Sequence, residues 1–304
     1  MTRADRVFAG LVVLALGSSA VLLALFGTLL LRAERLLVHG ADDTADLVVV
    51  LVLGLALCGI ALGLGSLLRQ LLATAQLIRS LLRRTVASPR HVGALAARLR
   101  LAGRIDVVAD ARPFSFCYWF LRPRICLSTG LLDRLDPDEL EAVLLHERSH
   151  LRRRDPLRLV VARYFAAGLY VVPVVEDLVE HYTLEKELEA DQDAVSALGD
   201  VRPLARALYK VLPDADRVDL GLLTPVGSLS VTEARIDQLV SGAPLALHLS
   251  ALHVALSGGA LVAAAVLALV EGPASPGLFI APATLLFAAA LSGGVQQLRL
   301  VTRP

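Results

Sequence analysis

Two long runs without a charged side chain, at residues 7–31 and 47–68, constrain the fold of this chain more than any other feature. A helix rises 1.5 Å per residue, so about 20 residues cross the roughly 30 Å of hydrocarbon in a bilayer. Each run is therefore long enough to span a membrane once. We expect a third crossing at 245–270 and a shorter fourth at 278–295, which contains Pro282.

A cleaved signal peptide is the alternative for the first run. Its apolar stretch exceeds the roughly 7–15 residues usual for such a segment, and a second apolar run follows soon after, which favours a retained helix. Composition agrees, because 56% of the residues are apolar and only 19% are charged, against about 45–50% apolar in soluble domains. This excludes a disordered chain, a nucleic-acid-coating protein and an ordinary cytosolic enzyme.

The distribution of basic residues predicts the orientation in the membrane. The stretch 69–104 is rich in arginine and has no acidic residue, whereas the loop 32–46 has four acidic residues against two arginines and the loop 271–277 has no basic residue. Basic segments favour the cytoplasmic side. We therefore expect a plasma-membrane protein with both termini and the middle segment in the cytoplasm. The arginines of 69–104 are interpreted as contacts to anionic lipid rather than to DNA, and no direct nucleic-acid binding is expected.

The pattern predicts three parts: an N-terminal transmembrane hairpin at 1–68, a middle domain at 69–245, and a C-terminal transmembrane hairpin with a short tail at 246–304. The middle domain should begin with a helix at 69–100 that Pro89 interrupts. A strand at 105–110 and a two-stranded hairpin at 114–120 and 124–128 should follow. The next helix has an Asp136-Pro137 start with Glu139 positioned for a capping box, and Asp155 precedes the proline that ends it.

This capped helix carries the chemistry, in the motif His146-Glu147-Arg148-Ser149-His150. Positions four apart lie on one face of a helix, so both imidazoles can bind one zinc ion, at about 2.0–2.1 Å. Glu147 lies about 100° round the helix from His146. It can therefore reach a metal-bound water as a general base without becoming a ligand.

A catalytic zinc needs a third protein ligand and one open position. The acidic helical run 185–191 offers Glu187 as the ligand, with Asp191 one turn later as hydrogen-bond acceptor for a ligand histidine, expected to be His146. Glu185 and Glu189 are also four residues apart, and spacing alone leaves them open.

These segments resemble the BlaR/MecR-type family of integral-membrane zinc metallopeptidases. The resemblance rests on 122–132, 135–155 and 187–194, and the related HtpX-type and CAAX-prenyl-protease peptidases share H-E-x-x-H and the later E-x-x-x-D. It implies Glu187, rather than Glu185 or Glu189, as the third ligand. It also implies a mainly α membrane protein of about four transmembrane helices, with a cytoplasmic α+β zincin-like metallopeptidase domain inserted between helices two and three. The antibiotic sensors of this family carry an extracellular penicillin-binding domain after the last span, and we expect no β-lactam sensing of that kind here.

The implied activity is zinc-dependent endoproteolysis of cytoplasmic or membrane-proximal proteins, with one zinc per chain. A transcriptional repressor is a plausible substrate by resemblance, and membrane-protein quality control is the second role considered. A further donor should stabilise the tetrahedral oxyanion. His181, Tyr182 and Arg235 are the candidates, the last because Arg235-Ile236 loosely resembles an Arg-Ile pair of the HtpX-type family.

The apolar run 157–175 cannot cross the membrane once, because Glu187 would then lie on the opposite side from His146; it should be a buried or membrane-apposed helix, or enter and return on one side. The alternative function is a catalytically idle metal-binding sensor or scaffold. His248 and His253, within the third predicted span, are interpreted as structural.

Overall fold

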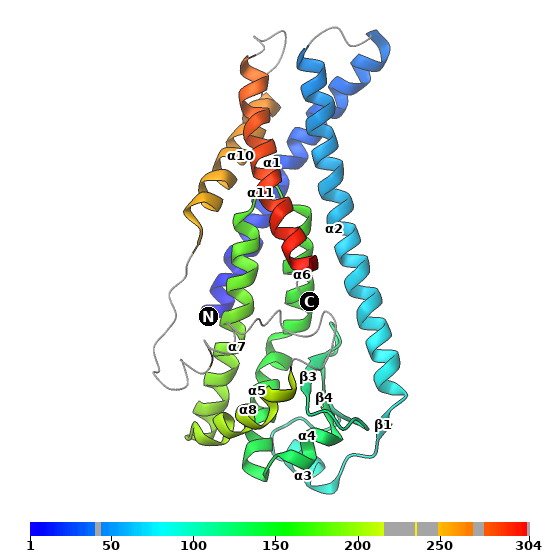
Figure 1. The fold of residues 1–304 in the computed structure, drawn as a ribbon, viewed down its shortest axis with the longest axis vertical. Coiled ribbons are helices and arrows are strands. Elements are labelled where there is room, and N and C mark those ends of the chain that lie inside the picture. The colour runs from blue at the N-terminus through cyan, green and yellow to red at the C-terminus, as the bar shows by residue number, and fades with distance from the viewer. Residues whose placement is uncertain (40–43, 216–234, 236–248, 270–276, 303–304) are drawn as a thin grey trace. The chain divides into compact units, whose positions relative to one another are not determined.

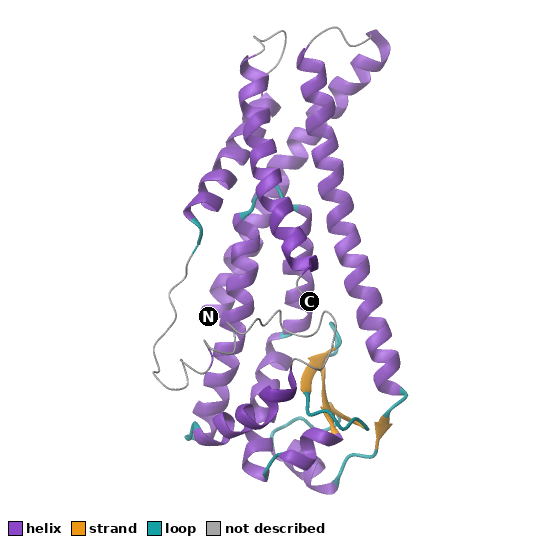
Figure 2. Ribbon diagram, in the orientation of Figure 1, coloured by secondary structure: helices purple, strands orange, loops and turns teal. Residues whose placement is uncertain are grey.

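The computed structural model describes residues 1–39, 44–215, 235, 249–269 and 277–302 (Figure 1). It is mainly helical with one small sheet (Figure 2). The elements are, in order, α1 (Arg3–His39), α2 (Thr44–Leu82), β1 (Thr85–Val86), α3 (Arg90–Arg98), β2 (Ile105–Val108), β3 (Ser115–Tyr118), β4 (Arg124–Ser128), α4 (Thr129–Arg134), α5 (Pro137–Arg153), α6 (Asp155–Gly168), α7 (Val174–Leu198), α8 (Arg202–Ala215), α10 (Ala251–Leu269) and α11 (Gly277–Thr302).

The chain divides into two compact units. Residues 1–68, 161–181 and 247–304 form one, here called the apolar unit, and residues 69–160 and 182–246 form the other, called the sheet unit. Residues 161–181 thus group with the apolar helices, although the sequence analysis placed them in the middle domain. α6 and α7 each begin in one unit and end in the other.

Three described helices are long and apolar enough to cross a membrane: α1 over Arg3–Arg32, α2 over Leu47–Leu82, and α10. In the apolar unit α10 packs against α1 and α11. α11 has Pro282 inside it and is not among those three. The fourth span, and with it the four-helix arrangement, stays a prediction, as does the side of the membrane on which each part lies.

The run 157–175 covers most of α6, the turn that follows it and the first residues of α7, so it includes the turn of a helical hairpin. α6 ends at Gly168 and α7 begins at Val174, with a turn between them closed by backbone hydrogen bonds such as Val172 N to Leu169 O, 2.7 Å. Glycine allows close approach to this turn from α2 and α11. A Cβ on Gly59 would lie 2.7 Å from Gly168 O, and one on Gly293 would lie 1.8 Å from Tyr170 O.

Polar contacts also hold the hairpin within the apolar unit. His253 Nδ1 lies 2.8 Å from an Asp177 carboxylate oxygen, and Val174 N donates to Ser257 Oγ at 3.0 Å. His253 therefore joins α10 to α7, in keeping with the structural role predicted for it. His248 lies outside the described residues.

The sheet has the order β1-β2-β4-β3. β3 and β4 pair antiparallel, which confirms the predicted hairpin, and β4 pairs parallel with β2. The predicted helix at 69–100 is wrong in one place: α2 ends at Leu82, and Thr85–Val86 forms an edge strand paired with β2. β-branched residues favour strands, and the residue before Pro89 disfavours the helical conformation.

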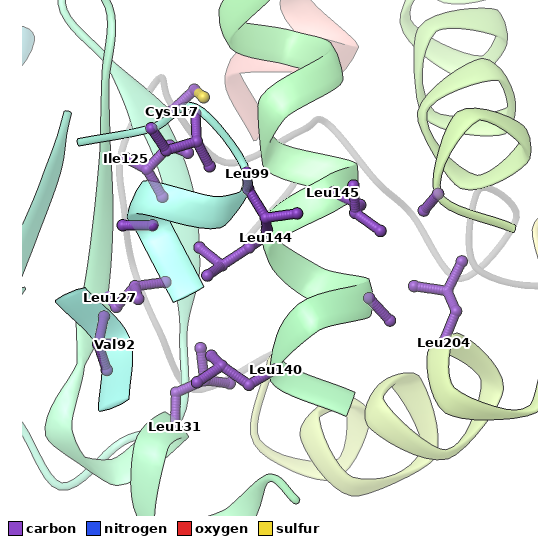
Figure 3. Close-up of a cluster of buried hydrophobic side chains, with 14 residues drawn as sticks. Val92, Leu99, Cys117, Ile125, Leu127, Leu131, Leu140, Leu144, Leu145 and Leu204 are labelled. Atoms are coloured by element: carbon purple, nitrogen blue, oxygen red, sulfur yellow. The ribbon is translucent and has the colours of Figure 1, made fainter. Parts of the chain in front are cut away.

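Helix α5 packs its apolar stripe against β3 and β4 and begins with the predicted cap. Leu140 and Leu144 are buried with Ile125 and Leu127 of β4, as Figure 3 shows. The Glu139 carboxylate accepts a hydrogen bond from Asp136 N at 2.9 Å, and Arg154 closes the helix in a left-handed conformation with φ 56°. This packing fixes the rotation of α5 and hence the direction of its histidine face.

Candidate metal centre

The structure brings together His146 and His150 of α5 with Glu187 of α7. The two Nε2 atoms are 3.0 Å apart, and Glu187 Oε2 lies 3.5 Å from His146 Nε2 and 3.6 Å from His150 Nε2. All three side chains are buried. They form the one set of at least three metal-ligating groups found among the described residues.

A carboxylate faces the outer nitrogen of each imidazole. His146 Nδ1 lies 2.8 Å from Asp191 Oδ1, and His150 Nδ1 lies 2.7 Å from Asp155 Oδ2. A carboxylate in this position sets the tautomer and the ring orientation, leaving Nε2 as the free ligand atom. Both Nε2 atoms consequently point to the place that Glu187 also faces.

The three candidates for an oxyanion donor have different surroundings. Arg235 makes a two-pronged ion pair with Asp191, each contact 2.8 Å, and its Nη1 lies 3.9 Å from Glu187 Oε2. The buried Tyr182 hydroxyl donates to Asp155 Oδ1 at 3.1 Å. His181 belongs to the apolar unit. Arg235 and Tyr182 thus contact the two carboxylates that face the histidines, and Ile236 lies outside the described residues.

Glu147 has one engaged and one open carboxylate oxygen. Ser115 Oγ, on β3, donates to Glu147 Oε1 at 2.8 Å. Glu147 Oε2 is buried and has no hydrogen-bond partner among the described residues. A buried carboxylate oxygen without a hydrogen-bond partner destabilises the fold unless a water or a substrate group donates to it. This arrangement suits a group that must accept a proton.

The pKa shifts follow from the charges packed around the ligands. Burial alone would raise the pKa of Glu187, but the Lys186 ammonium, 2.5 Å away, and His150 hold it well below its ordinary value. Burial alone would lower the pKa of His150, but the Glu187 and Asp155 carboxylates raise it to about 10. Glu187 is therefore ionised and ready to bind a cation.

The charge and spacing of this cluster fit a divalent metal. Four carboxylates surround the two imidazoles, namely Glu147, Asp155, Glu187 and Asp191, and the permanently charged groups beside them are Lys186 and Arg235. Ligands at about 2.0–2.2 Å from a tetrahedral zinc lie about 3.3 Å apart, close to the observed separations of 3.0, 3.5 and 3.6 Å. Two imidazoles and a carboxylate form a donor set that zinc accepts, and three protein ligands leave a fourth position open.

Comparison with known proteins agrees with this geometry. A family model described as BlaR1 peptidase M56 matches residues 38–236, more than half of the chain. The chain belongs to the BlaR1 peptidase M56 family. Several curated proteases are also similar. Protease HtpX homolog 1 of Streptomyces coelicolor is 33% identical over 88 residues, covering 28% of this chain and 27% of that protein.

Two further relatives match a longer stretch of the chain. Protease HtpX homolog 2 of Methanosarcina mazei is 29% identical over 126 residues, 31% of this chain and 43% of that protein. The Protease HtpX homolog of Halobacterium salinarum is 32% identical over 114 residues, 29% of this chain and 39% of that protein. The chain thus spans less than half the length of each of these relatives.

Sequence reasoning missed several residues that contact the centre. Asp155 was interpreted only as part of the helix end, and Ser115 only as part of a strand. Lys186 and the thiol of Cys117, which lies 3.2 Å from Glu147 O, were likewise not assigned to the site. The position of Asp155 five residues after His150 was the available signal, because a carboxylate often faces the outer nitrogen of a ligand histidine.

Proposed function

We propose that this protein is a membrane-bound zinc metalloendopeptidase. The observation that carries the proposal is the convergence of His146 Nε2, His150 Nε2 and Glu187 Oε2, with Glu147 next to His146 on the same helix and one of its oxygens buried without a partner among the described residues. Membership of a peptidase family and three helices able to span a membrane support it. Zinc, when bound here, would polarise the scissile carbonyl and acidify a bound water.

In this proposal, different residues bind the metal, transfer the proton and position the base. His146, His150 and Glu187 hold the metal. Glu147 Oε2 accepts the proton of the attacking water and later passes one to the leaving amine, while Ser115 fixes the other oxygen of the same carboxylate. Arg235 is the best-placed donor for the oxyanion among the three candidates, since its Nη1 lies 3.9 Å from Glu187 Oε2.

The substrate is proposed to be an extended polypeptide lying along β3. β3 is an edge of the described sheet, so its outer backbone groups can pair with another strand. Ser115 on this strand contacts Glu147, which brings the edge next to the proposed base. A paired substrate would therefore present its backbone to the reacting groups.

We propose that the substrates are cytoplasmic or membrane-proximal proteins, because the chain carries its own spans and its arginine distribution favours a cytoplasmic sheet unit. A transcriptional repressor is one such substrate, and a misfolded membrane protein is another. Incubating the purified protein with each class of substrate, and mapping the cleaved bonds by mass spectrometry, separates the two roles.

The decisive experiment compares Glu147→Gln with the unmodified protein and with a matched control, Glu141→Gln. Glu141 lies on the same helix but pairs with the exposed Arg98 at 2.6 Å. We expect Glu147→Gln to retain one zinc per chain and to lose about 10²–10⁴-fold in peptide hydrolysis, whereas Glu141→Gln retains both. Zinc binding without hydrolysis in the unmodified protein would favour the alternative, a catalytically idle metal-binding sensor or scaffold.

A further inference from the structure

A second feature of the sheet unit lies outside the metal centre, in the loop that joins β3 to β4. This tip loop consists of Trp119, Phe120, Leu121, Arg122 and Pro123. Trp119 is 44% exposed and Leu121 is 74% exposed. Exposed apolar surface on the β-hairpin is therefore gathered at its tip.

Exposed leucines also occur in the part of α2 that belongs to the sheet unit, at Leu71, Leu72 and Leu82, on a helix that is itself a candidate span. Among the described residues of the sheet unit after Leu82, the other large apolar side chains that are exposed are Val86 on β1 and Tyr209 on α8, each isolated. The neighbouring aromatic residues Phe116 and Tyr118 are buried, so the exposure begins abruptly at Trp119. Its backbone also has φ 67°, a left-handed conformation that bulky residues rarely adopt and that gathers at functional sites.

The base of the tip loop is firmly held. The Arg124 guanidinium contacts both Asp106 oxygens, at 2.5 and 2.6 Å, and donates to Gly103 O at 2.8 Å. Arg104 donates to Pro123 O at 3.3 Å. The loop is thus presented from a fixed support, which lowers the entropy lost when it meets a partner.

The residue types of the tip loop match a membrane interface. Tryptophan prefers the boundary between head groups and acyl chains, leucine prefers the acyl side, and an exposed arginine is attracted to anionic head groups. The loop has no acidic residue. The sheet unit also begins at Arg69, directly after the predicted crossing at 47–68, so the chain enters this unit from a bilayer surface.

We propose that residues 119–123 form an interfacial anchor that inserts into the head-group boundary of a bilayer containing anionic lipid. Since β3 leads directly into the tip loop, the anchor would hold this sheet edge at the membrane surface. The anchor concerns lipid contact alone and would exist whether or not the chain cleaves peptides.

Trp119 is the one tryptophan of the chain, so its fluorescence reports on the tip loop without a label. The full chain would be reconstituted in vesicles of phosphatidylcholine and phosphatidylglycerol whose phosphatidylcholine is brominated either near the head-group end or near the bilayer centre. If the anchor lies about 5–10 Å into the boundary, bromine near the head-group end should quench Trp119 fluorescence at least about twofold more than bromine near the bilayer centre. Iodide in the buffer should quench this fluorescence weakly.

Two variants sharpen this test. In a Trp119→Phe background, Tyr209→Trp places a reporter at the isolated exposed position on α8, and we expect iodide rather than bromine to quench it. The second variant combines Leu121→Ser with Arg122→Ser and retains Trp119. We expect bromolipids to quench Trp119 less in this variant than in the unmodified chain. Emission of Trp119 that bromolipids leave unchanged, or equal bromine quenching at positions 119 and 209, would overturn the proposal.

Discussion

Asp155 Oδ2 lies 2.7 Å from His150 Nδ1, and the other oxygen of this carboxylate accepts a hydrogen bond from the Tyr182 hydroxyl at 3.1 Å. Asp155 begins α6 directly after the helix that carries His150, while Tyr182 comes from α7. The second histidine of the centre is thus held by a chain of contacts that links α5, α6 and α7. Asp155, at the end of one helix and the start of the next, thus supports a proposed metal ligand.

Replacing Asp155 with asparagine should weaken zinc binding about 10–100-fold, because the neutral amide holds the His150 ring less firmly and lowers its basicity. Affinity can be measured by competition with a chromophoric chelator. Asp200→Asn is the control, since Asp200 pairs with the exposed Arg202. Equal affinities for the two variants would show that Asp155 does not support the ligand.

Ser115→Ala should lower the rate of peptide hydrolysis about 10-fold while zinc stoichiometry stays unchanged. The reason is that the Ser115 hydroxyl holds one oxygen of Glu147 at 2.8 Å, and without it the carboxylate is free to turn away from the attacking water. Initial rates and zinc content measured on the same preparation test this. A loss of zinc together with activity would instead indicate a structural role for Ser115.

Arg235→Lys should reduce zinc affinity about 10-fold despite keeping the charge. A lysine ammonium cannot reproduce the two contacts, each 2.8 Å, that the guanidinium makes with Asp191, so the carboxylate that faces His146 is held less well. The matched control is Arg202→Lys, which alters an exposed pair with Asp200. Chelator competition on both variants gives the comparison, and identical curves would argue against a positioning role for Arg235.

Glu139 should make the sheet unit sensitive to acid. Burial alone would raise its pKa, but Lys210, Asp136 N and Arg206 hold the pKa of Glu139 below its ordinary value of 4.5. A carboxyl group with a lowered pKa in the folded state stabilises the fold above the unfolded-state pKa, and this stability is lost as the pH falls through the folded-state pKa. We expect Glu139→Gln to cost about 1 kcal/mol at neutral pH and to flatten the acid side of the thermal-unfolding profile in detergent.

Gly293→Ala should destabilise the apolar unit by about 1–3 kcal/mol, because the new Cβ would lie 1.8 Å from Tyr170 O. Gly294→Ala is an adjacent control, since a Cβ there meets nothing within 4 Å. Thermal unfolding in detergent should separate the two variants clearly. If both unfold at the same temperature, α11 does not pack on the hairpin turn as described.

Local features of the sequence predicted much of this fold and of the candidate site. The cap at Asp136 and Glu139 and the stripe through Leu140 and Leu144 located α5, and helical spacing then placed His146 and His150 on one face. The approach of Asp191 to His146 also follows from spacing, since both this residue and Glu187 lie on one face of α7.

Contacts between distant segments were harder to predict. The parallel pairing of β2 with β4 joins strands separated by a hairpin, and the two residues of β1 are too few to give a periodic signal. Asp155 both lies at the end of α5 and contacts His150 Nδ1. The sequence indicated only its place at the helix end. For 157–175, the sequence left a buried or membrane-apposed helix and a segment that enters and returns on one side open; the structure shows that the chain turns between α6 and α7.

The route of α6 and α7 has a practical consequence for biochemical work. Asp155 opens the first of these helices, Glu187 and Asp191 lie on the second, and the intervening turn is packed among apolar helices by Gly59 and Gly293. A fragment that keeps all the proposed metal-binding side chains on one continuous chain must also keep this apolar turn, without the helices that pack on it. Purification of the intact chain in detergent or lipid is therefore the sound starting point for enzymology.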